Sequence, residues 1–569
     1  MKEKICHGFF IVLIIALLTG NVLFWASKKE GFHLDELYSY NQIANTDYSK
    51  PEFDRPNEPF LNSWHDRSCY EDFLTVDKDE AFNVSAFYES ASRNGAHPPL
   101  YLTLFGIFVS AFSPDNFTKW SGITFNIIFY ILTLLVLYDL SANVMKNRKA
   151  AIISVILYGG SICAVSTVLF IRVYMMLTFF TVSYFDLHIH LLNKELDTSC
   201  PIRKRLPAYI GIIIALILGA LSQYYFVVLA FFVGLMYFLI LLASKKNRLL
   251  VEYILINLTA LSLYIAIWPN FFRDLLSGPR GPEAIGNLKK SPDQFGVQFG
   301  HYLSEIDEHL TGGKGILLLL IIAVLLLIKI VKIYAVRIVV EKDASFELSC
   351  DRSANEKSAD MSGKIKLGKE YLLVLFITLP TICYLFLITR IAPILLYDLY
   401  KDIRYLFNII PLFIVINVFF IVKVFHKFYN RRSYKIASAI LLIALTILAY
   451  STKDVDYLYK GADDQMKQLE PFSNCRAVYV ADYNHFSTNS IVYFTKNKAV
   501  YTTTPKDIST LEEAFEGADD ERILLYLNDK IDGSEYVLDL IMKELNAKGK
   551  VQLFKTVGLF EADVYLLEL

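Results

Sequence analysis

Cysteine and charge are both scarce in this chain of 569 residues. The 7 cysteines form no CxxC pair and no Cys/His spacing of the zinc type, so a zinc finger or a CxxC redox centre is not expected. Only 20% of the residues are charged, and the formal net charge is -1, which leaves no basic surface for a nucleic acid partner. No repeat of fixed period divides the chain.

Long apolar runs dominate the sequence instead. Hydrophobic residues make up 54% of the chain and aromatic residues 14%, and the mean hydropathy is +0.39. The first run follows a basic start but lacks an A-x-A cleavage site, so we interpret it as a retained anchor and not as a signal peptide. The pattern predicts an α-helical polytopic membrane protein with about eleven transmembrane helices. They begin near residues 6, 120, 150, 174, 207, 224, 250, 315, 371, 405 and 436.

The distribution of lysine and arginine predicts the orientation. The apolar stretch 98–113 is short for a span and opens with two prolines, so we interpret it as a helix lying in the membrane interface. The basic loops then all fall on one side, which the positive-inside rule makes cytoplasmic together with the N-terminus. These loops are 146–149, 202–205, 244–248 and 427–435, with the Lys329 and Lys332 flank.

This topology divides the chain into two domains. Residues 1–450 form the transmembrane domain, with a first outer loop over 28–119 that carries interfacial helices. A second outer loop spans 269–313, and 337–370 is a flexible cytoplasmic loop rich in Ser, Asp, Glu and Lys. Residues 451–569 alternate apolar strand-like segments with helical ones, which predicts a soluble extracytoplasmic α/β domain. That domain has no glycine-rich phosphate loop, so it is not expected to bind nucleotides.

Two adjacent carboxylates, Asp35 and Glu36, directly follow the first span. A carboxylate at the headgroup level can accept a proton from a hydroxyl nucleophile. The alternative is a solvated acidic loop without a catalytic role. His97 stands before two prolines in "AHPPLY", which would aim it at the outer headgroup zone, although a capping role is an alternative.

Cationic residues also collect at the predicted outer face. Arg172 lies between two apolar spans, where it either binds a lipid phosphate or extends to the interface as a helix-end arginine. Arg404 and Tyr405 begin a later span, with Lys401 and Arg390 nearby. Several cations at one membrane level predict a phosphate pocket.

Five motifs occur in an order that resembles the C superfamily (GT-C) of membrane glycosyltransferases. They are "LDELYSY", "AHPPLYLTLF", "IRVYMMLTFF", "LSQYYF" and "IRYLFNIIP". The chain is most similar to the family 39-like branch, akin to protein O-mannosyltransferases and bacterial lipid A aminoarabinose transferases. The resemblance covers about residues 1 to 425 and implies a GT-C-like fold and an extracytoplasmic active site. The C-terminal domain lies outside it.

The resemblance also implies roles for individual residues. Asp35 matches the catalytic acidic position and Glu36 its neighbour, so both are expected catalytic residues. The expected substrate-binding residues are His97, Arg172, Tyr174, Gln223, Tyr224, Arg390, Lys401, Arg404 and Tyr405. Many relatives have a histidine where this chain has Gln223, which puts a sugar-binding role of that turn in question. Asp35 and Glu36 could share a divalent metal ion, although no ligand set is defined and no other cofactor is expected.

The resemblance implies an integral-membrane inverting glycosyltransferase, which we expect in the plasma membrane. Its donor would be a polyprenyl-phosphate sugar, and its acceptor a hydroxyl of a lipid, a protein or a cell-envelope glycan. One base suffices because phosphate is a good leaving group. Loop 269–313 would close as a lid over the donor, or else be a disordered loop. The alternatives are a polytopic lipid or sugar transporter or flippase, and a catalytically inactive scaffold of the same fold.

Overall fold

The computed structural model describes most of the chain. The described residues are 2–46, 61–195, 201–315, 369–392, 402–428, 450, 454–481, 490–517, 520–529, 531–557 and 561–569. The spans predicted to begin near residues 315 and 436, nearly all of the loop 337–370, and Lys401 lie outside this part.

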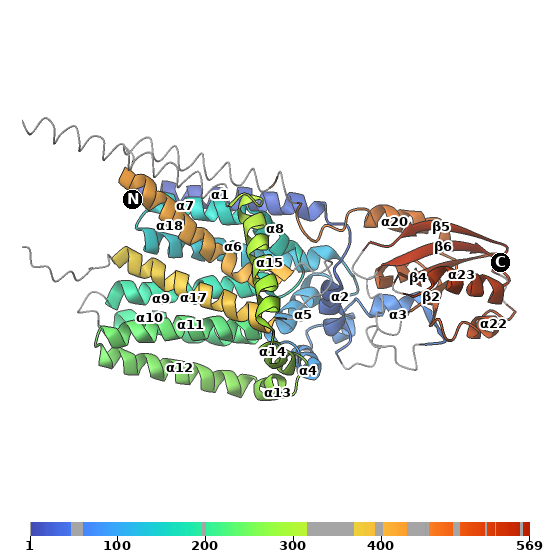
Figure 1. The fold of residues 1–569 in the computed structure, drawn as a ribbon, viewed down its shortest axis with the longest axis horizontal. Helices are drawn as coiled ribbons and strands as arrows, with labels where there is room; N and C mark the ends of the chain where they lie inside the picture. Colours follow the sequence, from blue (N-terminus) through green and yellow to red (C-terminus); the bar gives the residue numbers. More distant parts are fainter. Residues whose placement is uncertain are drawn as a thin grey trace, which may run out of the picture.

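A bundle of long apolar helices forms the larger part of the molecule (Figure 1). In the described residues, 8 helices are long and apolar enough to cross a membrane. They are α1 (Lys2–Ser27), α6 (Lys119–Met145), α9 (Tyr174–Glu195), α10 (Ile202–Ser222), α11 (Tyr224–Ala243), α12 (Asn247–Ile267), α17 (Lys369–Ile391) and α18 (Ile410–Phe428), which continues from the 3-10 helix η2 (Asp402–Ile409). The prediction of a polytopic helical membrane protein is confirmed.

The apolar run predicted to begin a span near residue 150 forms two helices with a bend between them. α7 (Arg148–Gly159) and α8 (Ile162–Leu169) meet at an angle of 52°. Gly160 ends the first helix, and the Ser161 hydroxyl accepts a hydrogen bond from the amide of Ala164, so that it caps the second. In α8, the Ser166 hydroxyl accepts a hydrogen bond of 3.0 Å from the amide of Asp456, which lies in the segment before the C-terminal domain.

Short helices cover one end of the bundle. They are α2 (Leu34–Ala44), α4 (Val84–Asn94), α5 (Leu100–Phe112), α13 (Phe271–Leu276), α14 (Arg280–Asn287) and α15 (Pro292–Thr311). Figure 1 shows α2 and α5 between the bundle and the C-terminal domain, and α13 and α14 at the same end. The loop expected over 269–313 is thus folded into three helices, and the alternative of a disordered loop is wrong for the residues in α13 to α15.

The C-terminal domain contains a mixed sheet of six strands in the order β1-β3-β2-β4-β6-β5. The strands are β1 (Ser63–Asp66), β2 (Ala477–Val480), β3 (Ala499–Thr503), β4 (Arg522–Asn528), β5 (Gly549–Lys555) and β6 (Ala562–Glu568). β3, β2 and β4 are parallel, whereas β1, β6 and β5 pair antiparallel. Helices α20 (Ala462–Leu469), α21 (Ile491–Phe494), α22 (Thr510–Ala514) and α23 (Ser534–Glu544) accompany the strands. The predicted α/β domain is confirmed.

The central strands are buried on both faces. Val478 and Val480 of β2 pack in one cluster with Leu538 and Ile541 of α23. The alternate residue Tyr479 points to the other face, where its ring contacts Phe494 of α21 at 5.1 Å between centroids. This period of two, with apolar residues on both faces, is typical of strands in the middle of a covered parallel sheet.

One strand of this sheet, β1, comes from the N-terminal part of the chain, between α2 and the short helix α3 (Arg67–Asp72). β1 pairs with β3 in the register Ser63 to Thr502 and Asp66 to Ala499. Arg67, which follows β1, donates from Nη2 to the carbonyl oxygen of Ser473 at 2.7 Å. The division at residue 451 therefore misses a segment near residue 65 that is part of the C-terminal sheet.

Candidate active site at the end of the helix bundle

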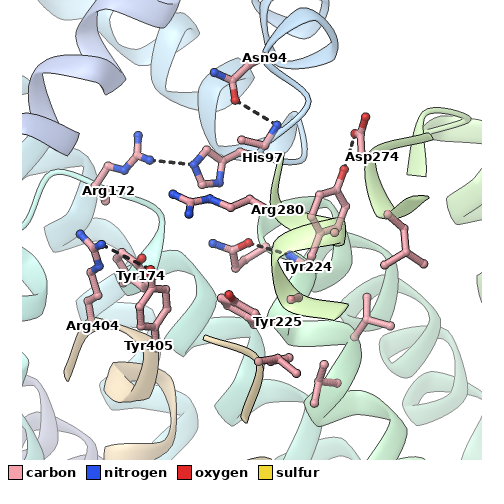
Figure 2. Close-up of a pocket in the computed structure, with 18 of the residues that line it drawn as sticks. Asn94, His97, Arg172, Tyr174, Tyr224, Tyr225, Asp274, Arg280, Arg404 and Tyr405 are labelled. Carbon is pink, nitrogen blue, oxygen red and sulfur yellow. Dashed lines mark hydrogen bonds between the residues drawn. The ribbon is translucent and has the colours of Figure 1, made fainter. Parts of the chain in front are cut away.

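A cavity of about 390 Å³ opens at the end of the bundle that faces the sheet domain. Side chains from the outer helices and from the ends of the long helices line it together (Figure 2). The lining residues are Asp35, Tyr38, Gln42, Asn94, Ala96, His97, Arg172, Tyr174, Gln223, Tyr224, Tyr225, Val227, Val228, Phe271, Asp274, Leu275, Arg280, Gly281, Ala284, Ile391, Arg404 and Tyr405. Of the expected site residues, the cavity collects Asp35, His97, Arg172, Tyr174, Gln223, Tyr224, Arg404 and Tyr405.

Asp35 lies in the first turn of α2. His33 caps this helix, because its Nδ1 accepts a hydrogen bond of 2.9 Å from the amide of Asp35. Oδ2 of Asp35 accepts a hydrogen bond of 2.5 Å from Nη1 of Arg404. Burial alone would raise the pKa of Asp35, but the guanidinium groups of Arg404 and Arg172 together hold it well below its usual range. Asp35 is therefore ionised, with 24% of its side chain exposed to the cavity.

Three guanidinium groups reach the same cavity, those of Arg172, Arg280 and Arg404. Arg172 lies in the turn between α8 and α9, and its Nη1 donates to the hydroxyl of Ser39 in α2 at 3.1 Å. Arg280 opens α14 and extends toward the other two arginines (Figure 2). The sequence analysis placed Arg280 only in a possible lid, so its contribution to the site is new. Three cations and two carboxylates, those of Asp35 and Asp274, line the cavity, which leaves a net positive charge that suits an anion.

His97 accepts the second bond from Arg172. Its Nε2 lies 3.0 Å from Nη2 of Arg172, and arginine is always a donor, so Nε2 is the acceptor and Nδ1 carries the proton of the neutral ring. Burial, with the positive charge of Arg172, lowers the pKa of His97 well below its usual value. In the described part of the chain, Nδ1 is buried without a hydrogen-bond partner. The Nδ1–H group of His97 is therefore a hydrogen-bond donor at the wall of the cavity.

Glu36 faces away from the cavity and is fully buried beside Lys29, with 2.9 Å between Oε2 and Nζ. Its carboxylate also accepts from the backbone amides of His33 at 2.6 Å and Ile171 at 2.8 Å. Lys29 in turn donates to the carbonyl oxygen of Tyr457 at 2.8 Å. Burial raises the pKa of Glu36 and lowers that of Lys29, so each group needs the other to remain charged. The pair joins the end of α1, helix α2, the α8–α9 turn and the C-terminal segment.

This arrangement does not suit a metal ion shared by Asp35 and Glu36. Both oxygens of Glu36 already accept hydrogen bonds, and the Asp35 carboxylate is paired with Arg404. A divalent cation at Asp35 would also lie next to three guanidinium groups. The two carboxylates thus have separate environments and separate tasks.

The turn between α10 and α11 forms the opposite wall. Gln223 caps α11 by accepting from the amide of Tyr224 at 2.9 Å. The hydroxyl of Tyr224 donates to Oδ2 of Asp274 at 2.6 Å and accepts from Nε1 of Trp268 at 2.9 Å. Arg273 holds the other carboxylate oxygen of Asp274 at 2.8 Å. The turn therefore anchors α13 to the bundle, and Asp274 is a cavity residue that the sequence analysis did not single out.

One expected substrate-binding residue, Arg390, lies outside the cavity lining. Nη1 of Arg390 donates to the carbonyl oxygen of Lys290 at 2.6 Å, and its guanidinium lies 4.6 Å from the ring centroid of Phe295. These contacts attach α17 to α15 outside the cavity lining. Lys401 is outside the described residues.

The remaining wall of the cavity is apolar, formed by Val227, Val228, Leu275, Ala284 and Ile391. Near it, α13, α14 and the start of α15 carry exposed apolar side chains, which are Phe272, Leu275, Leu276, Ile285, Leu288 and Val297. An apolar surface of this kind next to a positively charged cavity suits an amphiphile with an anionic head.

Comparisons with known proteins reveal similarity in fold only. No family model matches the chain, and no curated protein matches it. Among solved structures, it is similar to ArnT from Cupriavidus metallidurans bound to undecaprenyl phosphate, with 10% identity, 98% of each chain covered and a TM-score of 0.49. The apo state of ArnT gives 11% identity, the same coverage and a TM-score of 0.47.

An archaeal oligosaccharyltransferase is also similar. AglB from Archaeoglobus fulgidus, in complex with an inhibitory peptide and a dolichol-phosphate, is 11% identical over 91% of this chain and 69% of that chain, with a TM-score of 0.44. At these identities and TM-scores, the roles of individual residues in this chain rest on its own geometry.

Proposed function

We propose that this protein is an integral-membrane inverting glycosyltransferase. It transfers a sugar from a polyprenyl-phosphate donor to a hydroxyl acceptor on the extracytoplasmic side of the plasma membrane. The observation that carries the proposal is the shared cavity of Asp35 with Arg172, Arg280 and Arg404. One carboxylate supplies the base, and the guanidinium groups supply a phosphate site.

The arginines account for donor binding and for departure of the leaving group. A guanidinium binds two phosphate oxygens in a forked geometry and remains charged at every physiological pH. When the bond between the anomeric carbon and the phosphate oxygen breaks, its electron pair stays on the phosphate. The extra negative charge is stabilised by cations that are already in position. The polyprenyl chain would lie along the apolar wall near Val227 and Leu275.

Asp35 accounts for activation of the acceptor. The acceptor oxygen attacks the anomeric carbon from the face opposite the phosphate, so the configuration inverts, and its proton passes to the Asp35 carboxylate. The low pKa that Arg404 imposes keeps Asp35 ionised in the free enzyme but makes it a weak base. A donor phosphate competes for Arg404, and its negative charge raises the pKa of Asp35 toward a useful value.

The ends of the helices support the extracytoplasmic placement. α6 begins at the cavity end with Lys119 and reaches the far end at Met145, where the basic residues 146–149 follow. The basic segments 202–205 and 244–248 begin α10 and follow α11 at the same far end. The positive-inside rule assigns that end to the cytoplasm and the cavity to the outside. Helices α13 and α14 would then cover the donor as a lid of the outer leaflet.

The test is turnover of a panel of radiolabelled polyprenyl-phosphate sugars by purified protein in lipid, with the parent compared to Asp35→Asn. We expect label to leave the lipid with the parent and to slow by a factor of about 10² to 10⁴ in the variant, while donor binding is retained. The anomeric configuration of the product, read by NMR, should be opposite to that of the donor.

Asp115→Asn is the matched control, because Asp115 pairs with Lys78 at the exposed surface. It should turn over like the parent. If Asp35→Asn turns over at the parent rate, Asp35 is not the base. If no donor in the panel is consumed, the next measurement is movement of the intact lipid across the membrane of vesicles. Movement without sugar transfer would indicate a flippase and not an enzyme.

A further inference from the structure

A second polar cluster lies in the half of the bundle remote from the cavity. Asp186 and His190 are one turn apart on α9, and Asp139 faces them from α6. α9 begins at the cavity with Tyr174, so a rise of about 1.5 Å per residue places Asp186 roughly 18 Å further along the helix. This cluster has no part in the proposed transfer reaction.

The three side chains converge on one point. Nε2 of His190 lies 2.6 Å from Oδ2 of Asp139 and 3.6 Å from Oδ2 of Asp186. One ligand atom from each residue lies within 4.8 Å of the other two. Nδ2 of Asn143, one turn beyond Asp139, lies 3.3 Å from the same imidazole nitrogen. Three potential ligand atoms from two helices therefore lie close enough together for a coordination set.

An independent observation points to a missing ligand. Asp186 is 8% exposed, and its Oδ1 is buried without a hydrogen-bond partner in the described part of the chain. A buried carboxylate oxygen normally has a donor or a cation next to it, because leaving it without one is costly. Nε2 of His190 already bonds Oδ2 of Asp139 at 2.6 Å, which is shorter than its distance to Asp186. Asp186 thus retains an unused anionic oxygen beside an imidazole and a second carboxylate.

We propose that Asp139, Asp186 and His190 bind one divalent transition-metal ion of the Zn²⁺ type, which clamps α6 to α9. One imidazole and two carboxylates suit such an ion, whereas Mg²⁺ and Ca²⁺ favour all-oxygen sites. Metal–ligand bonds of about 2.0 to 2.2 Å require donor atoms about 4 Å apart or closer, so the three ligand atoms must move closer together when the ion binds. The ion displaces the proton now shared by His190 and Asp139, and water or the Asn143 amide oxygen completes the coordination.

Co²⁺ is the direct probe, because its visible spectrum reports tetrahedral coordination with nitrogen and oxygen ligands. Full-length protein without a polyhistidine tag is titrated in detergent. We expect one equivalent to bind with a tetrahedral spectrum, to be displaced by Zn²⁺ and to be unaffected by excess Mg²⁺. Zn²⁺ should also raise the thermal unfolding midpoint.

Asp139→Asn and His190→Gln should weaken Co²⁺ binding by more than about tenfold and remove the Zn²⁺ effect on unfolding. Asp139 has 52% of its side chain exposed, so its variant is not expected to misfold. His301→Gln, at an exposed histidine of α15, is the matched control and should bind like the parent. Absence of stoichiometric Co²⁺ binding in the parent, or parent-like binding in Asp139→Asn and His190→Gln, would overturn the proposal.

Discussion

Arg404 donates from Nη1 to Oδ2 of Asp35 across 2.5 Å, although the two residues are 369 positions apart in the chain. Without a donor lipid, the proposed base is thus held by one of the groups proposed to bind phosphate. The carboxylate and the phosphate compete for the same guanidinium, so donor binding and base activation are linked.

Replacing Arg404 by Gln should change the pH dependence of turnover. In the parent, the pKa of Asp35 is held well below its usual range, so kcat/KM should show no decrease assignable to Asp35 above about pH 4. In Arg404→Gln, the effect of burial is no longer offset by Arg404, so the pKa of Asp35 rises. The decrease of kcat/KM on the acid side should therefore appear at a higher pH than in the parent. The rate should also fall by a factor of about 10² to 10³, because the leaving phosphate loses a cation.

The measurement is kcat/KM between about pH 4 and pH 8. Arg148→Gln, at the exposed start of α7 on the far end of the bundle, should retain the parent profile. A profile in Arg404→Gln that stays flat on the acid side would show that Arg404 does not control the ionisation of Asp35.

Breaking the Lys29–Glu36 pair should destabilise the protein more than it affects the reaction. Both side chains are 0% exposed, so Glu36→Gln leaves an uncompensated buried ammonium at a cost of about 3 to 5 kcal/mol. The double variant Lys29→Met with Glu36→Gln should lose less than Glu36→Gln alone. Thermal unfolding in detergent measures these changes. Turnover per folded molecule should remain in the order of the parent value, because Glu36 does not line the cavity.

Lys78→Met is the control for that series, since it breaks the exposed pair with Asp115 and should change stability by about 0.5 kcal/mol or less. If Glu36→Gln abolishes turnover in protein of parent stability, Glu36 has a direct catalytic role, as the sequence resemblance implies.

His97→Gln should reduce the loss of stability at acid pH. An unfolded imidazole takes up a proton near its usual pKa of about 6.5, whereas folded His97 stays neutral well below that value. The unfolded state therefore binds more protons below about pH 6.5, and folding stability falls as the pH decreases. Removing this histidine should lessen the slope by up to about 1.4 kcal/mol per pH unit.

Unfolding midpoints between about pH 7.5 and pH 5 measure this effect, with the exposed His301→Gln as control. A residual slope from His33 should remain, because burial lowers its pKa to about 3. An unchanged slope in His97→Gln would mean that His97 takes up its proton in the folded protein.

Tyr224→Phe should loosen the wall of the cavity that α13 forms. The change removes the donor to the buried Asp274 carboxylate and the acceptor of Trp268 Nε1, which costs about 1 to 3 kcal/mol. Hydrogen exchange should be faster in Phe271–Leu276, and KM for the donor should rise more than kcat falls. Tyr536→Phe, at a side chain that is 69% exposed, should leave both unchanged. Unaltered exchange in Tyr224→Phe would contradict this role.

Local sequence signals predicted most of the architecture. Apolar runs predicted the described spans, and strand-like apolar segments within 451–569 predicted an α/β domain, because each pattern reflects the burial of its own residues. β1 was missed because Ser63–Asp66 is short and polar, and it becomes a strand only by pairing with β3. The break between α7 and α8 was missed because glycine is tolerated in many apolar helices.

The site was predictable in its residue types and not in its pairings. Asp35, His97, Arg172 and Arg404 were singled out by charge at the ends of spans, but nothing local indicates that Arg172 bonds His97 or that Arg404 bonds Asp35. The separate environments of Asp35 and Glu36 follow from helical geometry, since neighbouring positions on α2 project about 100° apart. Arg280 and Asp274 enter the cavity only because α13 and α14 fold back onto the bundle.

The strand β1 has a consequence for biosynthesis. It leaves the ribosome more than 400 residues before its partner β3, yet it forms an edge of the finished sheet. During synthesis the segment that carries β1 has no strand partner until the C-terminal domain has been made. A C-terminal domain produced alone would in turn expose the edge of β3, where other chains can pair. The segment around β1, where the ring of Tyr70 packs against Phe494, can therefore reach its final structure only after the C-terminal domain is complete.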